Sequence, residues 1–317
     1  VAASPAASPA LAAQPAAGGF PDRPIRLIVP YAPGGLTDVT ARLVGEGIAR
    51  ALGQPVVVEN RPGANSIVGV GATATSPPDG YTLAMVIGAH AANATLYAGK
   101  LPFDPINSFA PVSHVVTTPL MLASGPQLPV RDLQGLLALA RERPGQIAYG
   151  SSGVGSAAHL AMEDLMLRTG TRMVHSPYRG TQPALQDLLA GRIGAMFDVF
   201  PGFAPHLAAG SIRGLGVASA EREGFAPAVP TLIEAGLPDF VASAWCVLLA
   251  PAGTPPAIVR RISDAATAFL REPATAPRLE ALGLAPVGST PEAATAFLRA
   301  EIDRWGRVIR AADVRVE

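Results

Sequence analysis

The stretch from Ile25 to Leu52 constrains the fold of this chain more than any other. Residues 25–29 (IRLIV) are an apolar run of strand length. The next six residues, PYAPGG, cannot continue a strand, because proline lacks an amide donor and glycine adopts backbone angles closed to other residues. Apolar residues at helical spacing then predict a helix as far as Leu52, with Thr37 or Asp38 as its N-terminal cap.

The turn between this strand and this helix is a candidate anion site. Unpaired amides at the start of a helix attract negative charge, and the helix dipole adds to that attraction. We therefore expect the segment Tyr31–Gly35 to hold a carboxylate. This motif alone leaves an alternative open, because ordinary β-to-α turns are abundant in α/β proteins.

Two further apolar strands follow at residues 55–59 and 81–87, separated by a segment of helix length. Strands that alternate with helices indicate βαβ units and a parallel sheet. Ligands bind such sheets at the carboxyl ends of the strands. Gly88, Ala89 and His90 follow the third strand, so we expect them to share a rim with Tyr31–Gly35.

The second half of the chain repeats this arrangement. A short strand at residues 147–149 leads into the glycine-rich turn GSSGVGS at 150–156, and a helix follows at 157–168. Two long apolar runs, at residues 112–123 and 241–250, are long enough to leave one sheet and enter another. The sequence therefore predicts two similar blocks that the chain crosses between twice.

The predicted fold class is α/β, with two lobes around a cleft. Each lobe is expected to be a mainly parallel sheet flanked by helices, and the two crossing strands are expected to act as a hinge. We assign residues 20–121 together with 228–317 to the first lobe and residues 122–227 to the second. The two glycine turns can then face one cleft from opposite sides.

Composition excludes several classes of protein. The 317 residues carry 24 basic and 24 acidic side chains, so no net charge favours nucleic acid or an anionic membrane. The single cysteine, Cys246, can form no internal disulfide. No run approaches the roughly 20 apolar residues that span a bilayer. We expect a monomer with a small-molecule ligand.

Residues 1–19 (VAASPAASPALAAQPAAGG) are rich in alanine, proline and serine and predict a disordered tether. Small residues at 10–13 resemble an export-signal cleavage site, although the charged and apolar regions of a signal peptide are missing. Two explanations of this segment are open. It is either the remainder of a trimmed signal for export to the periplasm or a plain linker, and we favour export.

Two sequence features could indicate a cofactor site or a metal site, but each pattern is incomplete. The segment GVGATA at 69–74 fits a dinucleotide-binding pattern, but a turn precedes it and no acidic residue lies between Asp79 and Asp104. Tight helix packing explains these glycines better. The histidines show no metal-ligand spacing, so we expect neither a metal nor a cofactor; they are His90, His114, His159, His175 and His206.

A hydrolase is the alternative from a different class. Serines at 151, 152 and 156, together with His159 and Asp198, invite a catalytic triad. However, the chain has no G-x-S-x-G elbow, and Ser156 stands where a helix cap belongs. Turnover of a bound carboxylate would favour this enzyme, whereas saturable binding without turnover would favour a binding protein.

Three charged residues lie beside the predicted turns. Asp198 ends a strand and can receive an amino or hydroxyl group of a ligand, and Arg179 can pair with a carboxylate through two hydrogen bonds. Asp38 lies at the start of the first helix. Each has a structural alternative, as a cap, a turn acid or a solvated arginine.

A series of motifs in order along residues 20–317 resembles the Bug family, the periplasmic substrate-binding proteins of tripartite tricarboxylate transporters. The matching stretches include RPIRLIVPYAPGGLTDVTAR (23–42), VVVENRPGANSIVG (56–69), HAANATLY (90–97), GSSGVGSAAHLAME (150–163), HSPYRGTQPALQDLLAG (175–191) and VPTLIEAG (229–236). Ala32 departs from the family, which often has proline there.

The resemblance implies a type II periplasmic-binding fold that closes on a small carboxylate, such as a di- or tricarboxylate, an acidic amino acid or an aromatic carboxylate. It implies a two-subunit membrane permease as partner, or a sensor domain instead. Carboxylate contacts are implied from both glycine turns, partly through backbone amides and ordered water. The predicted ligand-binding residues are Tyr31, Ala32, Pro33, Gly34, Gly35, Thr37, Asp38, Gly88, Ala89, His90, Ser151, Ser152, Gly155, Ser156, Arg179 and Asp198.

Overall fold

A computed structural model describes residues 19–316, so the predicted tether at 1–19 lies outside the described residues except for Gly19. The strands of the first lobe form a mixed sheet in the order β2-β1-β3-β9-β4, and β10 pairs with β4. Strand β1 is parallel to β2 and β3, whereas β9 is antiparallel to β3 and β4. The bounds are β1 (Ile25–Val29), β2 (Val56–Asn60), β3 (Thr82–Val86), β4 (Phe109–Ser124), β9 (Ser243–Pro251) and β10 (Ala285–Pro286).

The second lobe repeats this strand order, as β6-β5-β7-β4-β8. Strand β5 is parallel to β6 and β7, while β4 is antiparallel to β7 and β8. Each lobe thus holds a parallel core of three strands, to which the crossing strands add antiparallel neighbours. The bounds are β5 (Ala148–Ser151), β6 (Val174–Pro177), β7 (Ala195–Val199) and β8 (Arg213–Val217).

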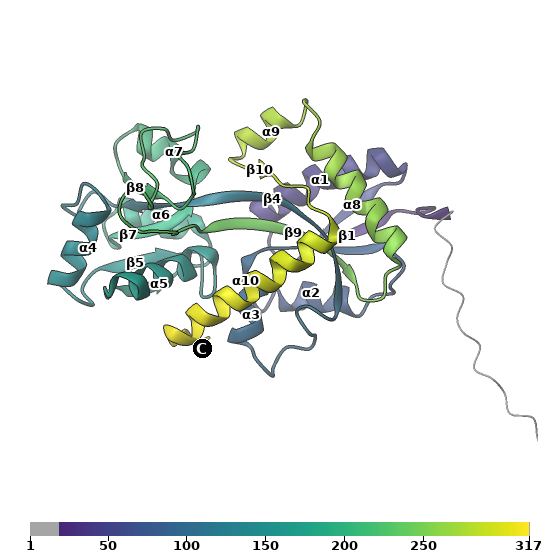
Figure 1. The fold of residues 1–317 in the computed structure, drawn as a ribbon, viewed down its shortest axis with the longest axis horizontal. Coiled ribbons are helices and arrows are strands. Elements are labelled where there is room, and N and C mark those ends of the chain that lie inside the picture. Colours follow the sequence, from purple (N-terminus) through teal and green to yellow (C-terminus); the bar gives the residue numbers. More distant parts are fainter. Residues whose placement is uncertain (1–18, 317) are drawn as a thin grey trace, which may run out of the picture.

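Strand β4 belongs to both sheets. Residues 109–119 pair with β9, and residues 120–124 lie between β7 and β8. Figure 1 shows β4 and β9 side by side as they connect the two lobes. This arrangement confirms the two predicted crossing segments. The lobe boundaries at residues 121 and 228 remain our proposal, because β4 continues through the first of them.

Helices cover both faces of each sheet. In the first lobe, apolar side chains of α1 and α8 pack on one face, and those of α2, α3 and α10 pack on the other. In the second lobe, α4 and α5 cover one face and α6 and α7 the other. The bounds are α1 (Leu36–Leu52), α2 (Ile67–Ala74), α3 (Gly88–Leu96), α4 (Leu133–Glu142), α5 (Ala157–Thr169), α6 (Thr181–Leu189), α7 (Phe200–Ala208), α8 (Pro256–Leu270), α9 (Ala276–Ala281) and α10 (Pro291–Ala311).

Helix α1 shows how the sequence determines one of these elements. Its buried face includes Leu43, Val44 and Ile48, at the spacing expected of a helix. The helix ends at Gly53, whose φ of 74° favours glycine and whose amide donates to the Ala49 carbonyl at 2.9 Å. Gly47 has no side chain to separate the helices, because a Cβ there would lie 2.1 Å from Phe269 Cγ on α8.

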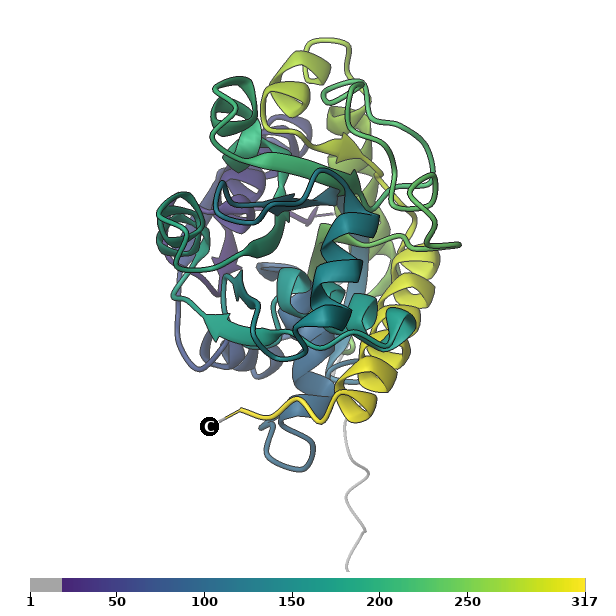
Figure 2. The same cartoon turned by 90° about the vertical axis from the view of Figure 1, so that its left-hand side faces the viewer.

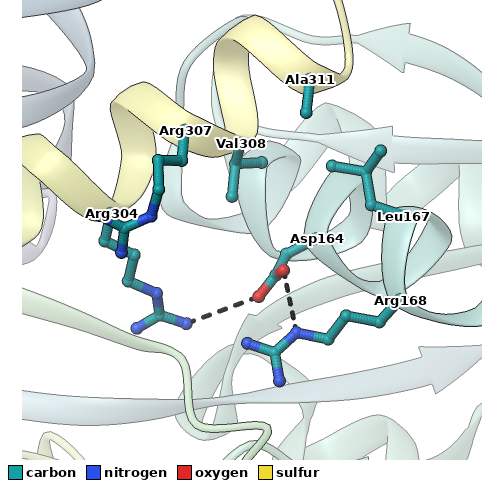
Figure 3. A pocket seen from close by; sticks show the side chains of 7 residues that line it. All are labelled: Asp164, Leu167, Arg168, Arg304, Arg307, Val308 and Ala311. Carbon is teal, nitrogen blue, oxygen red and sulfur yellow. Dashed lines mark hydrogen bonds and ion pairs between the residues drawn. The ribbon is translucent and has the colours of Figure 1, made fainter.

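Helix α10 extends from the first lobe to the second, where it meets α5 (Figures 1 and 2). Asp164 of α5 accepts a hydrogen bond from Arg168 Nε at 3.0 Å, and Arg304 Nη2 of α10 lies 3.7 Å from its other oxygen. Figure 3 shows the two guanidinium groups converging on this carboxylate beside a hollow of about 230 Å³. The α5–α10 contact therefore joins the lobes away from the β4–β9 hinge.

The predicted cap of the first helix is wrong. Helix α1 begins at Leu36 with Gly35 as its N-cap, and no side chain caps it. Thr37 and Asp38 lie within the first turn, because the left-handed conformation of Gly34 (φ 88°) turns the chain earlier than the sequence suggested. Within residues 19–316, no helix has the combination of length and apolarity that crossing a membrane requires.

Candidate functional site

The β1–α1 turn is open to solvent. Residues 32–35 are all exposed, and a Cβ built on Gly34 or Gly35 would meet no atom within 4 Å. Because no side chain caps α1, the amides of its first turn remain available at the positive end of the helix dipole. The turn predicted to hold a carboxylate is therefore accessible to one.

Asp38 holds this turn in shape from beneath. Its buried carboxylate accepts hydrogen bonds from the Gly34 amide at 3.0 Å, from Arg42 Nε at 3.1 Å and from Asn60 Nδ2 at 2.9 Å. These bonds, with Arg42 the largest contributor, lower the pKa of Asp38 to about 2. The same Asn60 amide donates to the Tyr31 carbonyl at 3.1 Å. The carboxylate is already engaged by these three groups, and its hydrogen bond from the amide positions Gly34.

The Tyr31 side chain packs against the core of the first lobe. Its hydroxyl group is buried and has no hydrogen-bond partner of normal geometry among the described residues. Burial raises the pKa of Tyr31. The Ser66 side chain lies beside this hydroxyl and opposes part of the rise in its pKa.

The residues after β3 divide into two roles. Gly88 and Ala89 begin α3, and a Cβ built on Gly88 would lie 3.8 Å from the Ala157 Cβ at the start of α5. His90 is buried, and its Nε2 donates to the Pro105 carbonyl at 2.8 Å. Burial lowers the pKa of His90 to about 4, so the ring is neutral at physiological pH. Its hydrogen bond anchors the connection at residues 98–108 rather than reaching toward the β1–α1 turn.

The β5–α5 turn is held together by its own hydrogen bonds. Ser151 Oγ is fully buried and lies 2.7 Å from His175 Nε2. The Ser152 carbonyl accepts from the Gly180 amide at 3.2 Å, which ties this turn to the β6–α6 turn. Ser156 caps α5, because its Oγ accepts from the His159 amide at 3.2 Å. The predicted role of Ser156 as a cap is confirmed.

Gly155 brings the second lobe against the first. Its φ is 77°, and a Cβ there would lie 2.6 Å from Leu96 Cδ1 and 3.6 Å from Ala92 Cβ, both on α3. Asn65 Nδ2 would lie 3.7 Å away. Together with the approach of Gly88 to Ala157, this contact places the amino end of α5 along α3, from its first residue Gly88 to its last residue Leu96. Only a residue without a side chain allows the turn to come this close.

A hollow of about 780 Å³ adjoins this contact and is lined from both lobes. Arg179, one of the predicted residues, is exposed in its wall, and no ion pair of Arg179 is found within residues 19–316. The sequence analysis missed the other wall residues, which are Asn65, Tyr97, Gly153, Val154, His175, Pro177, Arg315 and Val316. The guanidinium group of Arg179 in the wall of this hollow favours an anionic guest.

The start of α2 carries a signal that the sequence analysis read only as a turn. Ala64, Asn65 and Ser66 all have positive φ, at 45°, 50° and 77°. Such angles are unfavourable for residues other than glycine and cluster at functional sites. Asn93 of α3 holds the segment, since its Nδ2 donates to the Asn65 carbonyl at 2.7 Å. An asparagine-serine pair before a helix could have indicated this site, although its backbone angles could not be foreseen.

A sequence profile described as "Tripartite tricarboxylate transporter family receptor" matches residues 40–314 of this chain. The chain belongs to this receptor family. The match confirms the Bug-family resemblance, and the relatives are solute-binding proteins. BugT of Bordetella pertussis is 38% identical to this receptor over 316 residues, covering 98% of this chain and 96% of BugT.

Two solved structures from Rhodopseudomonas palustris share the fold of this receptor. Rpa4515 with adipate is 34% identical with a TM-score of 0.84, covering 93% of this chain and 99% of that one. MatC with bound malate is 33% identical with a TM-score of 0.80, covering 92% and 100%. The receptor therefore has the two-lobed, type II periplasmic-binding fold that was predicted, and both of these relatives were solved with dicarboxylates.

Asp198 of this receptor ends β7 and is almost fully buried. Its Oδ1 accepts from the Val199 amide at 2.7 Å, whereas Oδ2 has no hydrogen-bond partner of normal geometry within the described residues. Burial raises the pKa of Asp198 to about 6, although the Thr181 side chain and the Val199 amide oppose the shift. The carboxylate thus has one oxygen without a hydrogen-bond partner of normal geometry, and its predicted contact with a ligand stays a prediction.

We expect Asp198→Asn to stabilise the folded receptor at pH 7.5. In the unfolded chain Asp198 binds its proton near pH ~3.9, but in the folded protein it does so near pH 6. Ionised Asp198 therefore costs folding free energy above pH 6, and the cost vanishes as the pH falls toward 4. Urea unfolding should show a gain of about 1–3 kcal/mol at pH 7.5 and almost none near pH 4.

Asp187→Asn is the matched control. Its partly buried carboxylate pairs with Arg192, which lowers the pKa of Asp187. This substitution should therefore reduce stability slightly at pH 7.5, opposite in sign to Asp198→Asn. An Asp198→Asn receptor no more stable than the unchanged one at pH 7.5 would contradict the expected cost of the buried charge.

The groups proposed for a hydrolase do not assemble into a triad. Ser151 does lie within hydrogen-bond distance of a histidine, but that histidine is His175 rather than His159. Ser151 is fully buried, and Asp198 makes no hydrogen bond to Ser151 or to either histidine among the described residues. The contact between Ser151 and His175 therefore holds the turn in position.

The dinucleotide and metal motifs have structural explanations. Gly69 and Gly71 lie inside α2 rather than in a strand-to-helix turn, and a Cβ on Gly69 would lie 2.8 Å from the Arg61 carbonyl. These glycines allow close packing, as expected. Within residues 19–316, no group of three or more histidine, cysteine or acidic side chains could hold a metal ion. Cys246 is buried, and burial raises its pKa to about 12.

Proposed function

We propose that this receptor captures a small organic carboxylate between its two lobes, as an extracytoplasmic solute-binding protein. The observation that carries the proposal is the pair of glycine turns. The β1–α1 turn is exposed, with open space above Gly34 and Gly35, and the β5–α5 turn contacts the first lobe through Gly155. The amides at the starts of α1 and α5 can each bind an anion, and domain closure would enclose it.

A dicarboxylate is the ligand class that we favour. Its two charged ends could engage the helix starts of the two lobes, and adipate and malate, found in two relatives, are both dicarboxylates. The free oxygen of Asp198 would favour a ligand that brings a hydroxyl or amino donor, such as malate. Tricarboxylates, acidic amino acids and aromatic carboxylates are tested in the same screen.

The proposal includes a periplasmic location, a monomeric receptor and a two-subunit membrane permease as the partner that accepts the ligand. A sensor domain is the alternative partner, and we favour transport because the matching family is described as a transporter receptor. The proposal also includes the absence of catalysis. The buried position of Ser151 and its lack of a carboxylate partner support binding over hydrolysis.

A thermal-shift screen tests this function, because a ligand that binds only the folded state raises the melting temperature. We expect malate or adipate at about 100 times its dissociation constant to stabilise the receptor by roughly 2.7 kcal/mol. Gly35→Val should fold normally, since Gly35 has φ −82° and open space around it, but should lose this response. Its added bulk would occupy the space that the carboxylate needs.

Two results would count against the proposed function. One is the absence of any stabilisation by the carboxylates, and the other is an undiminished response in Gly35→Val. Product analysis of the bound ligand by mass spectrometry completes the test. Chemical conversion of that ligand would favour the hydrolase instead.

A further inference from the structure

Behind the β5–α5 turn lies a cluster of titratable side chains that the proposed function does not use. His159 of α5 and His175 of β6 are stacked, with ring centroids 3.8 Å apart and planes inclined by 8°. Tyr149 of β5 stacks on His175 at 4.9 Å, and Glu163 lies one helical turn after His159. His159 is 3% exposed, whereas His175 is half-buried and also lines the hollow.

Each histidine of this stack is hydrogen-bonded to the turn. The Gly155 amide donates to His159 Nδ1 at 3.1 Å, and Ser151 Oγ lies 2.7 Å from His175 Nε2. On the far side of the ring, His159 Nε2 lies 3.5 Å from Glu163 Oε1. The ring of His159 therefore connects Glu163 with the backbone of Gly155, the residue that contacts α3 of the first lobe.

These contacts determine where His159 carries its proton. The Gly155 amide is a donor, so Nδ1 must present a lone pair, and the single proton must be on Nε2, facing Glu163. A second proton would place an N–H group on Nδ1 against the N–H group of Gly155. The hydrogen bond that holds the turn would then be lost.

We propose that His159 is a positioning residue for ligand binding, which in its neutral form holds Gly155 and is released by acid. This inference rests on the proposed function, because it assumes that the β5–α5 turn contacts the ligand. Loss of the Gly155–His159 hydrogen bond would free the turn to move away from α3. The receptor would then hold its ligand less tightly in acid than at neutral pH.

The charged groups around His159 oppose one another. Glu163 favours a protonated ring, and hydrogen bonds from His159 and Tyr149 keep the pKa of Glu163 low despite its burial. His175 opposes protonation from β6, and Arg179 lines the hollow beyond His175. Arg315 of the C-terminal segment lines the same hollow.

His175 itself is not the switch. Burial, together with the charge that His159 would carry, lowers the pKa of His175 to about 3. It therefore remains neutral across the mildly acidic range, and its hydrogen bond to Ser151 persists there. His159 is the ring of the pair whose second proton would break the hydrogen bond to Gly155.

Two substitutions separate the roles of the His159 ring. His159→Asn keeps an acceptor near the Nδ1 position but does not titrate, whereas His159→Leu has no acceptor. Loss of one hydrogen bond to a binding turn corresponds to about tenfold in affinity. His114→Leu is the control, because His114 is also a buried histidine stacked on an aromatic ring but lies on β4 of the first lobe.

The first measurement needs no ligand. In receptor labelled with nitrogen-15, the backbone amide resonance of Gly155 should move as the pH falls from about 8 to about 6, the range in which histidines titrate. It should stay in place in His159→Asn and move normally in His114→Leu. If the Gly155 resonance of the unchanged receptor does not move over this pH range, the inference is overturned.

The second measurement is the affinity for malate by calorimetry over the same pH range. We expect the unchanged receptor to lose several-fold in affinity, His159→Asn to lose much less, and His159→Leu to bind about tenfold more weakly throughout. Equal affinity and equal pH dependence in His159→Leu would overturn the inference. If no carboxylate binds the unchanged receptor, the proposed function fails. The Gly155 resonance then still tests whether the hydrogen bond from Gly155 to His159 depends on pH.

Discussion

Replacing Gly155 with alanine is expected to weaken malate binding by at least about tenfold. The new methyl group would lie 2.6 Å from Leu96 Cδ1 on α3, closer than two carbons can approach. Leu96 would have to rotate its side chain, or the β5–α5 turn would have to withdraw from the first lobe, and either shift would disturb the contact between the lobes. Calorimetry at neutral pH measures this loss, and circular dichroism verifies that the variant is folded.

Gly170→Ala is the matched control for this substitution. Gly170 ends α5 with φ 62°, and a Cβ there would meet no atom within 4 Å. Both variants incur the backbone penalty of a left-handed residue, about 1 kcal/mol, but only Gly155→Ala creates a contact between the lobes. Unchanged affinity in Gly155→Ala, or an equal loss in Gly170→Ala, would show that the contact at Gly155 does not govern binding.

Asp38→Ala is expected to lower the free energy of unfolding by about 2–4 kcal/mol and to weaken carboxylate binding as well. The substitution removes the acceptor for the Gly34 amide, Arg42 and Asn60 at a buried position. The β1–α1 turn would lose the group that fixes its shape, so its amides would no longer converge on one anion. Urea unfolding and calorimetry measure the two effects.

The stabilisation of the folded receptor by the Asp38 carboxylate depends on pH. The folded pKa of Asp38 is about 2, below its ordinary value of ~3.9, so its contribution is complete above about pH 4 and disappears as the pH falls toward 2. The difference in free energy of unfolding between the unchanged receptor and Asp38→Ala should therefore narrow only below about pH 4.

Glu46→Ala is the control. It breaks a half-exposed ion pair with Arg278 and should lower the free energy of unfolding by about 0–1 kcal/mol. A cost of the same size for Asp38→Ala would refute the structural role of its carboxylate.

Sequence patterns were sufficient to locate most elements of the fold. The strands of the parallel cores are short apolar runs bounded by prolines and glycines, and α1 has a continuous apolar face. The crossing strands β4 and β9 were visible as long apolar runs. The antiparallel pairing of β4 with both β7 and β8 could not be predicted, because register depends on contacts between residues far apart in the chain.

The candidate site was less accessible to sequence reasoning. The glycine turns, the Ser156 cap and the strand-end position of Asp198 follow from local patterns. The hydrogen-bond partners of the predicted side chains do not follow from local patterns. His90 donates to the Pro105 carbonyl, and residues 64–66 have positive φ angles where Asn93 of α3 donates to the Asn65 carbonyl. Local spacing carries no information on these contacts.

By itself the sequence determined the alternation of strands and helices, the two crossings and the glycine turns, since these depend on the intrinsic preferences of neighbouring residues. Only the tertiary structure decided which amides remain open and which side chains are already engaged. It left Gly34 and Gly35 exposed, enclosed the Asp38 carboxylate in hydrogen bonds and brought Gly155 against α3. The physical reason is that hydrogen bonds and close packing join residues distant in the chain, and their energies depend on the relative positions of whole elements.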